Sequence, residues 1–343
     1  HLAQRKRPPE EEEVRITVPS TMNGQIASGE KNRYRYEARK GQRLVISVKA
    51  RELVPYIADG VPGWFQPIVA LHDAQGNELA YNDDFRFKPD PTLNFEVPAD
   101  GEYVLSIIDA LYRGRNDFVY RITMAEMPFV TSIFPLGGRV GEPVTIEVDG
   151  WNLDNAKLAS PPKDAGPGTY MIAATKGKAV SNQVPFALDT LPECFDAEAN
   201  DDQSKAQKVT LPTIVNGRMD QANDWDVFEI EGKAGETIVA EVHARRLDSP
   251  LDSFLKITDA SGARSIILSL SPGNGTARFL PKASFPPAAG KSVQFNPEGL
   301  PSNSQERAEC TFKVREEAWA VYLDSRPVVE LPALFVPPLV VYQ

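Results

Sequence analysis

Two short stretches of the sequence concentrate side chains whose oxygen atoms could bind a metal ion. They supply five carboxylates and one amide, namely Asp196, Glu198, Asn200, Asp201, Asp224 and Asp226. Hard cations such as calcium take roughly six to eight oxygen ligands from carboxylates, amides and carbonyls in turns. The pattern therefore predicts a calcium site, provided that the fold brings residues 196–201 and 224–226 together.

The spacing within these stretches favours such a convergence. Asp224 and Asp226 share one face of an extended strand, because alternate side chains of a strand point the same way. Carboxylates gathered in one place repel each other unless a cation neutralises them. In the alternative interpretation, each Asp or Asn side chain only caps a turn through the backbone. Both interpretations fit the sequence, whereas at Asn82-Asp83-Asp84 an ordinary Asx turn is favoured over a ligand turn.

An aromatic segment offers a second kind of chemistry. Tyr56, Trp64 and Phe65 lie in a stretch marked by Pro and Gly. Exposed aromatic rings can stack on sugars or on imino-acid-rich peptides, so these three residues are candidates for ligand binding. In the alternative interpretation, Trp64 and Phe65 fold back as a lid over the end of a domain.

Catalytic motifs are missing from the sequence. The histidines are His1, His72 and His243, and none lies in a nucleophile or metal motif. The sequence has no Gly-x-Ser-x-Gly elbow, phosphate-binding loop, His-Glu-x-x-His motif or dinucleotide fingerprint. We therefore expect no catalytic residue, no organic cofactor and no enzymatic activity.

Charge disfavours nucleic acid as a partner, and hydropathy gives no transmembrane helix. The 37 Lys and Arg against 47 Asp and Glu give a net charge of -10, which disfavours nucleic acid. The most apolar stretch, residues 331–341, is too short for a transmembrane helix and is interrupted by prolines.

The two cysteines, Cys194 and Cys310, allow one disulfide at most, and two free thiols fit equally well.

The elements that must position these residues are short strands. Branched residues bounded by Gly, Asp or Pro predict strands at 44–48, 103–108, 144–148 and 237–242. Long helical periodicity is absent, so the chain is predicted to be all-β, with antiparallel sandwiches.

An internal repeat shows how the strands are grouped. Residues 38–51 recur 194 positions later as residues 232–245, and the Asp-x-x-Gly turn at 73–76 recurs at 259–262. The first copy has eight extra residues between these anchors, and they include the aromatic segment. In this alignment Asp224 corresponds to Glu30 and Asp226 to Asn32, so the first copy lacks an equivalent acidic pair.

The repeated motifs resemble the bacterial pre-peptidase C-terminal domain. In the first copy the resemblance is carried by Asn23-Gly24, Tyr34-Arg-Tyr36, Lys40-Gly41-Gln42, Ala50-Arg51, Asp73-Ala-Gln-Gly76, Asn82-Asp83-Asp84 and Asp100-Gly101-Glu-Tyr103. In the second copy it is carried by Asn200-Asp201, Asp224-Trp-Asp226 and Ala244-Arg245. The intervening Phe129-Val-Thr-Ser-Ile-Phe-Pro135 and Gly150-Trp-Asn-Leu153 resemble an IPT/TIG immunoglobulin-like domain.

This resemblance implies a tandem array of jelly-roll-like, immunoglobulin-like and jelly-roll-like sandwiches. We expect a linker at 1–13, the first sandwich at 14–126, the immunoglobulin-like domain at 127–189 and the start of the second sandwich at 190–262. Residues 263–343 are rich in proline and lack the motifs that should follow. They are either a diverged completion of the second sandwich or unrelated sequence after a truncated domain.

The resemblance also implies a location and a role. Such domains belong to secreted bacterial proteins and are similar to the collagen-binding modules of collagenases. We expect a secreted, periplasmic or cell-envelope protein that binds an extracellular polysaccharide or a collagen-like protein, with calcium at the six acidic-stretch positions. The alternatives are the accessory part of a secreted peptidase whose catalytic domain is absent, and a structural spacer of the cell envelope.

Overall fold

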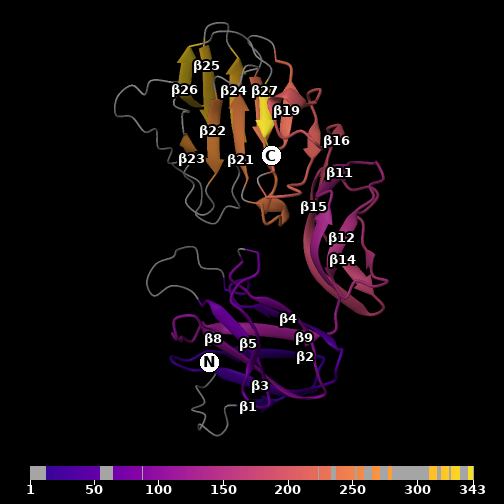
Figure 1. Ribbon diagram of the computed structural model, residues 1–343, viewed down its shortest axis with the longest axis vertical. Helices are drawn as coiled ribbons and strands as arrows, with labels where there is room; N and C mark the ends of the chain where they lie inside the picture. Colours follow the sequence, from indigo (N-terminus) through magenta and orange to yellow (C-terminus); the bar gives the residue numbers. More distant parts are fainter. Residues whose placement is uncertain are drawn as a thin grey trace. The chain divides into compact units, whose positions relative to one another are not determined.

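The computed structural model describes the backbone of most of the chain (Figure 1). Described are residues 13–54, 65–86, 88–222, 224–232, 237–251 and 253–258, together with the strands at 265–270, 277–279, 309–314, 318–323, 326–332 and 339–342. The elements in this part are β-strands and two short 3-10 helices, η2 (Gln203–Lys205) and η3 (Arg245–Leu247). The prediction of an all-β fold is confirmed, and no described helix is long and apolar enough to cross a membrane.

Two sheets made of residues before position 126 form the first sandwich. One has the strand order β1 (Glu13–Arg15), β3 (Asn32–Ala38), β8 (Gly101–Asp109), β5 (Pro67–Asp73) and β6 (Glu78–Asn82). The other has the order β2 (Ser20–Gln25), β9 (Val119–Ala125), β4 (Arg43–Lys49) and β7 (Thr92–Glu96). All the neighbouring pairs given with a register are antiparallel except β1 with β3.

The alternation of side chains explains why these sheets face each other. In β3, Asn32, Tyr34, Tyr36 and Ala38 are buried, while the residues between them lie toward solvent. The same period of two in β9 sends Tyr120, Ile122 and Met124 into a shared apolar core. Burial of this core drives the folding of the first sandwich.

A buried polar network lies at one end of that core. The Asn32 Nδ2 donates to the Tyr120 hydroxyl at 2.8 Å and to the Gln25 carbonyl at 2.8 Å, and the Tyr34 and Tyr120 hydroxyls are 2.7 Å apart. A Cβ atom at Gly24 would lie 2.3 Å from the Tyr120 ring. The glycine of the Asn23-Gly24 motif is therefore needed because this ring covers it.

The middle segment contributes two further sheets. One pairs β10 (Phe129–Phe134) with β12 (Glu147–Trp151), and the other has the order β11 (Gly137–Arg139), β15 (Ala179–Asp189), β14 (Gly168–Lys176) and β13 (Lys157–Leu158). The strand predicted at 144–148 begins only at Glu147. Pro143, which has no backbone N–H to donate, precedes the residues that stay outside the ladder.

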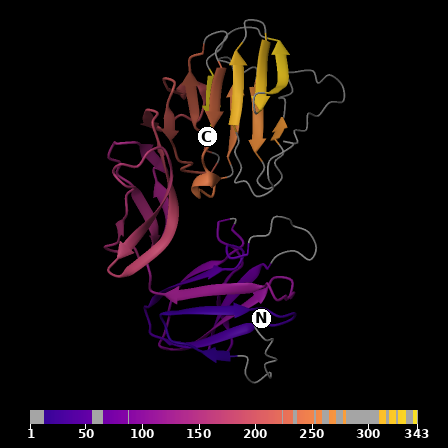
Figure 2. The same cartoon turned by 180° about the vertical axis from the view of Figure 1, so that it is seen from behind.

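Strands from the proline-rich tail pair with those of the second copy. A six-stranded sheet has the order β17 (Gln207–Lys208), β19 (Val227–Ile230), β27 (Leu339–Tyr342), β21 (Phe254–Thr258), β22 (Ser265–Leu270) and β23 (Ala277–Phe279). A four-stranded sheet has the order β20 (Thr237–Glu241), β24 (Glu309–Val314), β25 (Ala318–Leu323) and β26 (Arg326–Pro332), and Figure 2 shows these strands from behind. This pairing favours the interpretation in which the tail completes the second sandwich.

The chain divides into two compact units. Residues 1–132, 148–159 and 173–183 form the first, and residues 133–147, 160–172 and 184–343 form the second. The predicted acidic site lies wholly within the second unit. A two-stranded parallel ribbon, β16 (Glu193–Phe195) with β18 (Ile214–Asn216), leads the chain into it.

Candidate metal centre

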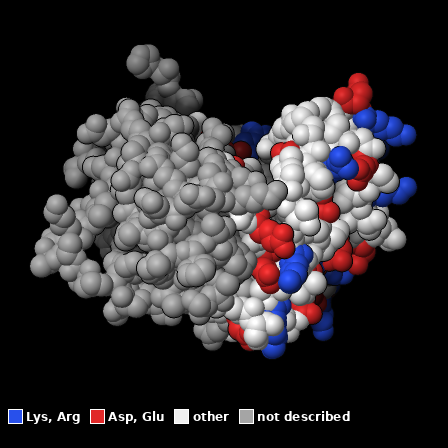
Figure 3. All heavy atoms as spheres, turned by 90° about the horizontal axis from the view of Figure 1, so that it is seen from above, with Lys and Arg blue, Asp and Glu red and all other residues white. Residues whose placement is uncertain are grey.

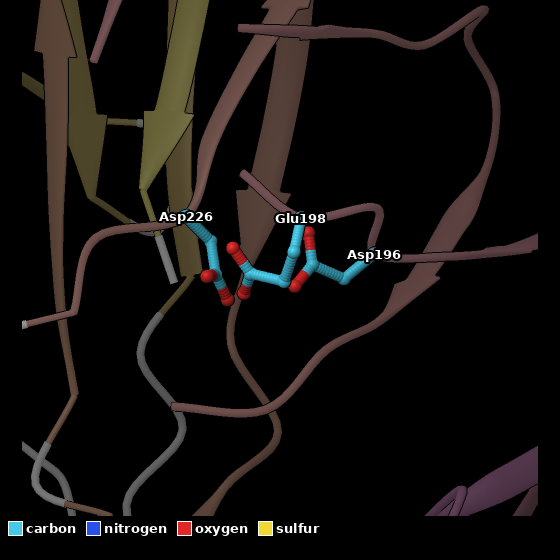
Figure 4. Close-up of side chains that lie close together, drawn as sticks. All are labelled: Asp196, Glu198 and Asp226. Carbon is cyan, nitrogen blue, oxygen red and sulfur yellow. The ribbon is translucent and has the colours of Figure 1, made fainter. Parts of the chain in front are cut away.

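The two acidic stretches meet at the edge of the second sandwich. Asp196 directly follows β16, and Glu198 lies in the segment that leads to η2. Asp226 directly precedes β19, whose start fixes its position. Figure 4 shows the carboxyl groups of Asp196, Glu198 and Asp226 directed toward one another.

Two groups of carboxylates have the spacing of cation ligands. Oxygen atoms of Asp196, Glu198 and Asp226 all lie within 4.8 Å of one another, and the same holds for Glu198, Asp201 and Asp224. Glu198 belongs to both groups. The five predicted carboxylates are therefore gathered in one place, with Glu198 at its centre, and the geometry suits a hard cation with oxygen ligands.

Several oxygen atoms in this cluster have no hydrogen-bond partner within the described part of the chain. Asp226 is fully buried with both carboxylate oxygens unpartnered, and Asn200 is fully buried with its Oδ1 unpartnered. One carboxylate oxygen of Asp224 is likewise buried and unpartnered. A buried polar atom without a partner is costly, so these oxygens fit a site completed by a bound cation.

The electrostatics of the cluster point the same way. Burial, followed by the negative charges of Asp196, Asp224, Glu198 and Asp220, raises the pKa of Asp226 to about 8. Burial is also the largest cause that raises the pKa of Asp196 and of Glu198. A divalent cation would reverse this situation by stabilising the ionised carboxylates.

Backbone and amide hydrogen bonds hold the ligand segment in place. The Asp196 N–H donates to the Asn216 carbonyl at 2.9 Å, and the Val227 N–H donates to the Asn200 carbonyl at 3.2 Å. Asn200 Nδ2 donates to Asp196 Oδ1 at 2.7 Å, and this bond leaves the Oδ1 of Asn200 available as a ligand. The segment is thus anchored to β18 and to the start of β19.

The first copy of the repeat satisfies the equivalent position in a different way. Asn32 occupies the place of Asp226 at the start of its strand and is also buried, but its amide donates to Gln25 and Tyr120. Glu30, in the place of Asp224, accepts a hydrogen bond from the Ala27 N–H at 2.7 Å. Protein groups therefore do in the first copy what a cation is suited to do in the second.

Turn capping accounts for other Asx residues more fully than for this cluster. Asp202, which the sequence did not single out, caps η2 by accepting from the Ser204 N–H at 2.8 Å. Asn82 Oδ1 accepts from the N–H of the next residue, Asp83, at 3.1 Å, and Asn82 Nδ2 donates to the Thr92 carbonyl at 2.7 Å, so hydrogen bonds within the protein engage this side chain. Asp224 combines both roles, because one oxygen accepts from the Asp220 N–H at 2.5 Å and the other is unpartnered.

The predicted aromatic ligand site is only partly described. Tyr56 and Trp64 lie outside the described residues, whereas Phe65 is 5 % exposed and stacks on Phe118 with 5.3 Å between ring centroids. Phe65 is thus part of the core of the first sandwich and does not offer a ring to a ligand. The apolar core at the start of β5 takes up this ring, as the lid alternative expects.

Two residues near the acidic cluster carried no prediction from the sequence. Asp220 adds its negative charge to those acting on Asp226, and its position four residues before Asp224 was an available signal. Gln207 bridges the ligand segment, with Oε1 accepting from the Ala197 N–H at 2.8 Å and Nε2 donating to the Phe195 carbonyl at 2.9 Å. No sequence signal marked Gln207.

The remaining candidate residues show no catalytic arrangement within the described part of the chain. His243 Nε2 lies 3.3 Å from Glu241 Oε2 at the surface, and Cys194 is a free thiol. On the face shown in Figure 3, acidic and basic side chains are intermixed over the described residues. That view shows no continuous basic area of the kind that binds a phosphate backbone.

Comparisons with known proteins give partial matches. No protein-family model matches the chain. A probable subtilase-type serine protease of Deinococcus radiodurans is 33% identical over an alignment of 108 residues, and the match covers 27% of this chain and 14% of the relative. The chain therefore spans about a seventh of the length of that curated relative.

Among solved structures, the chain is similar to the pre-peptidase C-terminal domain of a Bacillus anthracis collagenase. The identity is 19%, the TM-score is 0.25, and the match covers 35% of this chain and 99% of that domain. Aeromonas hydrophila PliG, a periplasmic lysozyme inhibitor, matches at 11% identity and a TM-score of 0.22, over 33% of this chain and 97% of the inhibitor.

Proposed function

We propose that this chain is a non-catalytic, exported β-sandwich protein whose second sandwich binds calcium and which attaches to an extracellular polymer or protein. The observation that carries the calcium part is the fully buried Asp226, whose two carboxylate oxygens have no partner among the described residues and face Asp196 and Glu198. An all-oxygen donor set with five carboxylates suits calcium rather than zinc or copper, which favour nitrogen and sulfur ligands.

Calcium would act here as a structural ion. It would neutralise the carboxylates of residues 196–201 and 224–226 and hold the segment before η2 against the start of β19. Because the ion binds the folded state, it stabilises that state by mass action. The attachment role follows from the resemblance to pre-peptidase C-terminal domains and from the aromatic residues Tyr56 and Trp64.

Calorimetric titration of the metal-free protein with calcium chloride tests the ion site. We expect heat of binding and a rise in melting temperature. An Asp224→Ala/Asp226→Ala variant should lose both effects, and an Asp83→Ala/Asp84→Ala variant, altered at the Asx turn, should keep them. Wild-type protein that gives neither heat nor a melting shift would exclude the site.

Attachment is tested by pull-down on insoluble polysaccharides and on collagen. We expect retention of the wild-type protein and reduced retention of Trp64→Ala, with Leu111→Ala, a change at an exposed apolar residue, as the matched control. Equal retention of wild type and Trp64→Ala would exclude Trp64 as a residue that binds the polymer. No retention on any of these polymers would favour the structural spacer.

The accessory part of a secreted peptidase is the second candidate. The 33% identity to a subtilase-type protease over 108 residues favours it. In that case the attachment described above would serve a catalytic domain on the same polypeptide. Sequencing the gene on both sides of the region for residues 1–343 would reveal whether such a domain is encoded.

A further inference from the structure

An aromatic and ionic clamp joins the middle segment to the strand that carries the first acidic residue. The Phe134 ring, at the end of β10, lies 5.9 Å from the Phe195 ring at an interplanar angle of 58°. The Arg218 guanidinium stacks over the Phe134 ring, 3.8 Å from its centroid, and forms an ion pair with Glu147 at the start of β12. We call Phe134, Glu147, Phe195 and Arg218 the clamp; all four belong to the same compact unit.

The clamp and the acidic cluster share one short ribbon. Phe195 ends β16 and is followed directly by Asp196, while Arg218 lies two residues beyond Asn216, the last residue of β18. Phe195 pairs with Asn216 across the ribbon, and the Asp196 N–H donates to the Asn216 carbonyl at 2.9 Å. One clamp residue, Phe195, thus ends β16 next to Asp196, and another, Arg218, follows the end of β18, whose Asn216 carbonyl accepts from the Asp196 N–H.

Repulsion in the cluster acts along this ribbon. Without a cation, the charges of Glu198 and Asp224 oppose the approach of Asp196. One peptide unit joins Asp196 to Phe195, which is 54% exposed and whose ring packs on Phe134, so a displacement of Asp196 would shift this ring contact. A bound cation removes the repulsion between Asp196 and its neighbouring carboxylates, and this favours the contact between the rings of Phe195 and Phe134.

We propose that cation binding at Asp196, Glu198 and Asp226 and closure of the clamp are thermodynamically coupled, so that the middle segment regulates the affinity of the ion site. This inference rests on the proposed calcium site. Coupling of this kind is reciprocal: if the cation tightens the clamp, the clamp raises the affinity for the cation by the same factor. Neither Phe134 nor Arg218 is a ligand, which separates the coupling from the coordination itself.

Calcium titration of the full chain and of three variants tests the coupling. Phe134→Ala and Arg218→Gln open the clamp without altering a carboxylate of the acidic cluster, and we expect each to weaken calcium binding by about five-fold or more. Arg86→Gln is the matched control, because Arg86 also stacks on a ring, that of Phe85 at 5.5 Å, in the first unit. Its affinity should equal that of the wild type.

Hydrogen exchange of the wild-type protein gives a second readout that needs no variant. Calcium should slow exchange in peptides that contain Phe134 and Glu147, which lie outside the ion site, and should leave peptides of β3 and β8 unchanged. Calcium binding with unaltered variant affinities, or with unaltered exchange at Phe134, would overturn the coupling while leaving the ion site intact. A wild-type protein that does not bind calcium would overturn the proposed function itself.

Discussion

At the scale of single residues, Asp226 and Asn32 show how one fold position accepts two solutions. Both are buried at the start of equivalent strands, yet the amide of Asn32 donates to Tyr120 while the carboxylate of Asp226 has no described partner. An amide offers both donors and acceptors, whereas an ionised carboxylate only accepts. A carboxylate at this position therefore depends on a proton or a cation.

The first prediction concerns the pH dependence of the metal-free protein. The pKa of Asp226 is raised to about 8 in the folded state, against 3.8 for the free side chain. Between these values the folded state holds a proton that the unfolded state has lost, so the free energy of unfolding falls as pH rises from about 4 to about 8.

Asp226→Asn removes this titration, so we expect the variant to be more stable than metal-free wild type at pH 8 and closer to it at pH 5. Urea unfolding in the presence of a chelator measures the difference. Asp83→Asn serves as the control. A stability difference between Asp226→Asn and wild type that is the same at both pH values would contradict the raised pKa.

At the scale of elements, the sequence indicated which strands exist better than it indicated how they pair. The strands β3 and β4 and the Gly turn between them followed from the pattern of apolar and branched residues and from Gly41. Those inferences depend on local spacing, which one sequence displays. The carboxylates of 196–201 and 224–226 do lie close together, but not for the predicted reason of a shared strand face, because Asp224 and Asp226 precede β19, which begins at Val227.

Long-range pairing and the burial of single rings were not visible in that way. Phe65 lies beside a proline- and glycine-marked stretch that is typical of a surface loop, and its contacts with Phe118, just before β9, and with Tyr120 explain its burial. Likewise β27 takes the place between β19 and β21 without any of the motifs expected there. Its pairing depends on the sheet as a whole, because edge groups of β19 and β21 need a partner.

The second prediction tests β27. Val341 pairs with Phe228 on one side and with Ile257 on the other, so a proline at this position removes a backbone donor in the middle of the sheet. We expect Val341→Pro to destabilise the second sandwich by roughly 1–3 kcal/mol, because a carbonyl in the sheet loses its donor, and to abolish calcium binding. Circular dichroism and calcium titration follow the two effects.

Val341→Thr keeps the backbone N–H and a β-branched side chain, and it should bind calcium as the wild type does. A Val341→Pro protein with unchanged melting would mean that the strand at 339–342 does not contribute to the sheet. The first sandwich, whose strands lie before residue 126, provides an internal reference in both variants.

At the scale of the whole molecule, two compact units each have their own core, and only one contains the acidic cluster. A ligand stabilises the cooperative unit that binds it and leaves an independent unit unaffected. Ring stacking among Phe85, Phe129 and Trp151, with Asn152 Nδ2 donating to the Arg43 carbonyl at 2.9 Å, ties β12 to the first sandwich within the first unit. Fused units of this kind should still unfold separately where their cores are separate.

The third prediction is a calorimetric one. Differential scanning calorimetry should resolve two transitions, and calcium should raise the temperature of one of them while the other stays within experimental error. Asp224→Ala/Asp226→Ala should abolish the shift, and Asp83→Ala/Asp84→Ala should preserve it. A calcium-induced rise of both transitions by the same amount would show that the chain unfolds as one cooperative body.

The position of β27 has a consequence for the order in which the second sandwich assembles. Phe228 of β19 pairs with Val341 of β27, which lies more than a hundred residues later in the chain. The hydrogen-bond ladder between β19 and β27 therefore cannot form until that distant segment is in place. Contacts of such high sequence separation form slowly, because a long loop has to close first. Asp226 directly precedes that same strand, so we expect the acidic cluster to form late in folding. Calcium is therefore expected to slow the unfolding rate far more than it speeds folding. The ion would then stabilise the second sandwich after it has folded, and it would not nucleate folding.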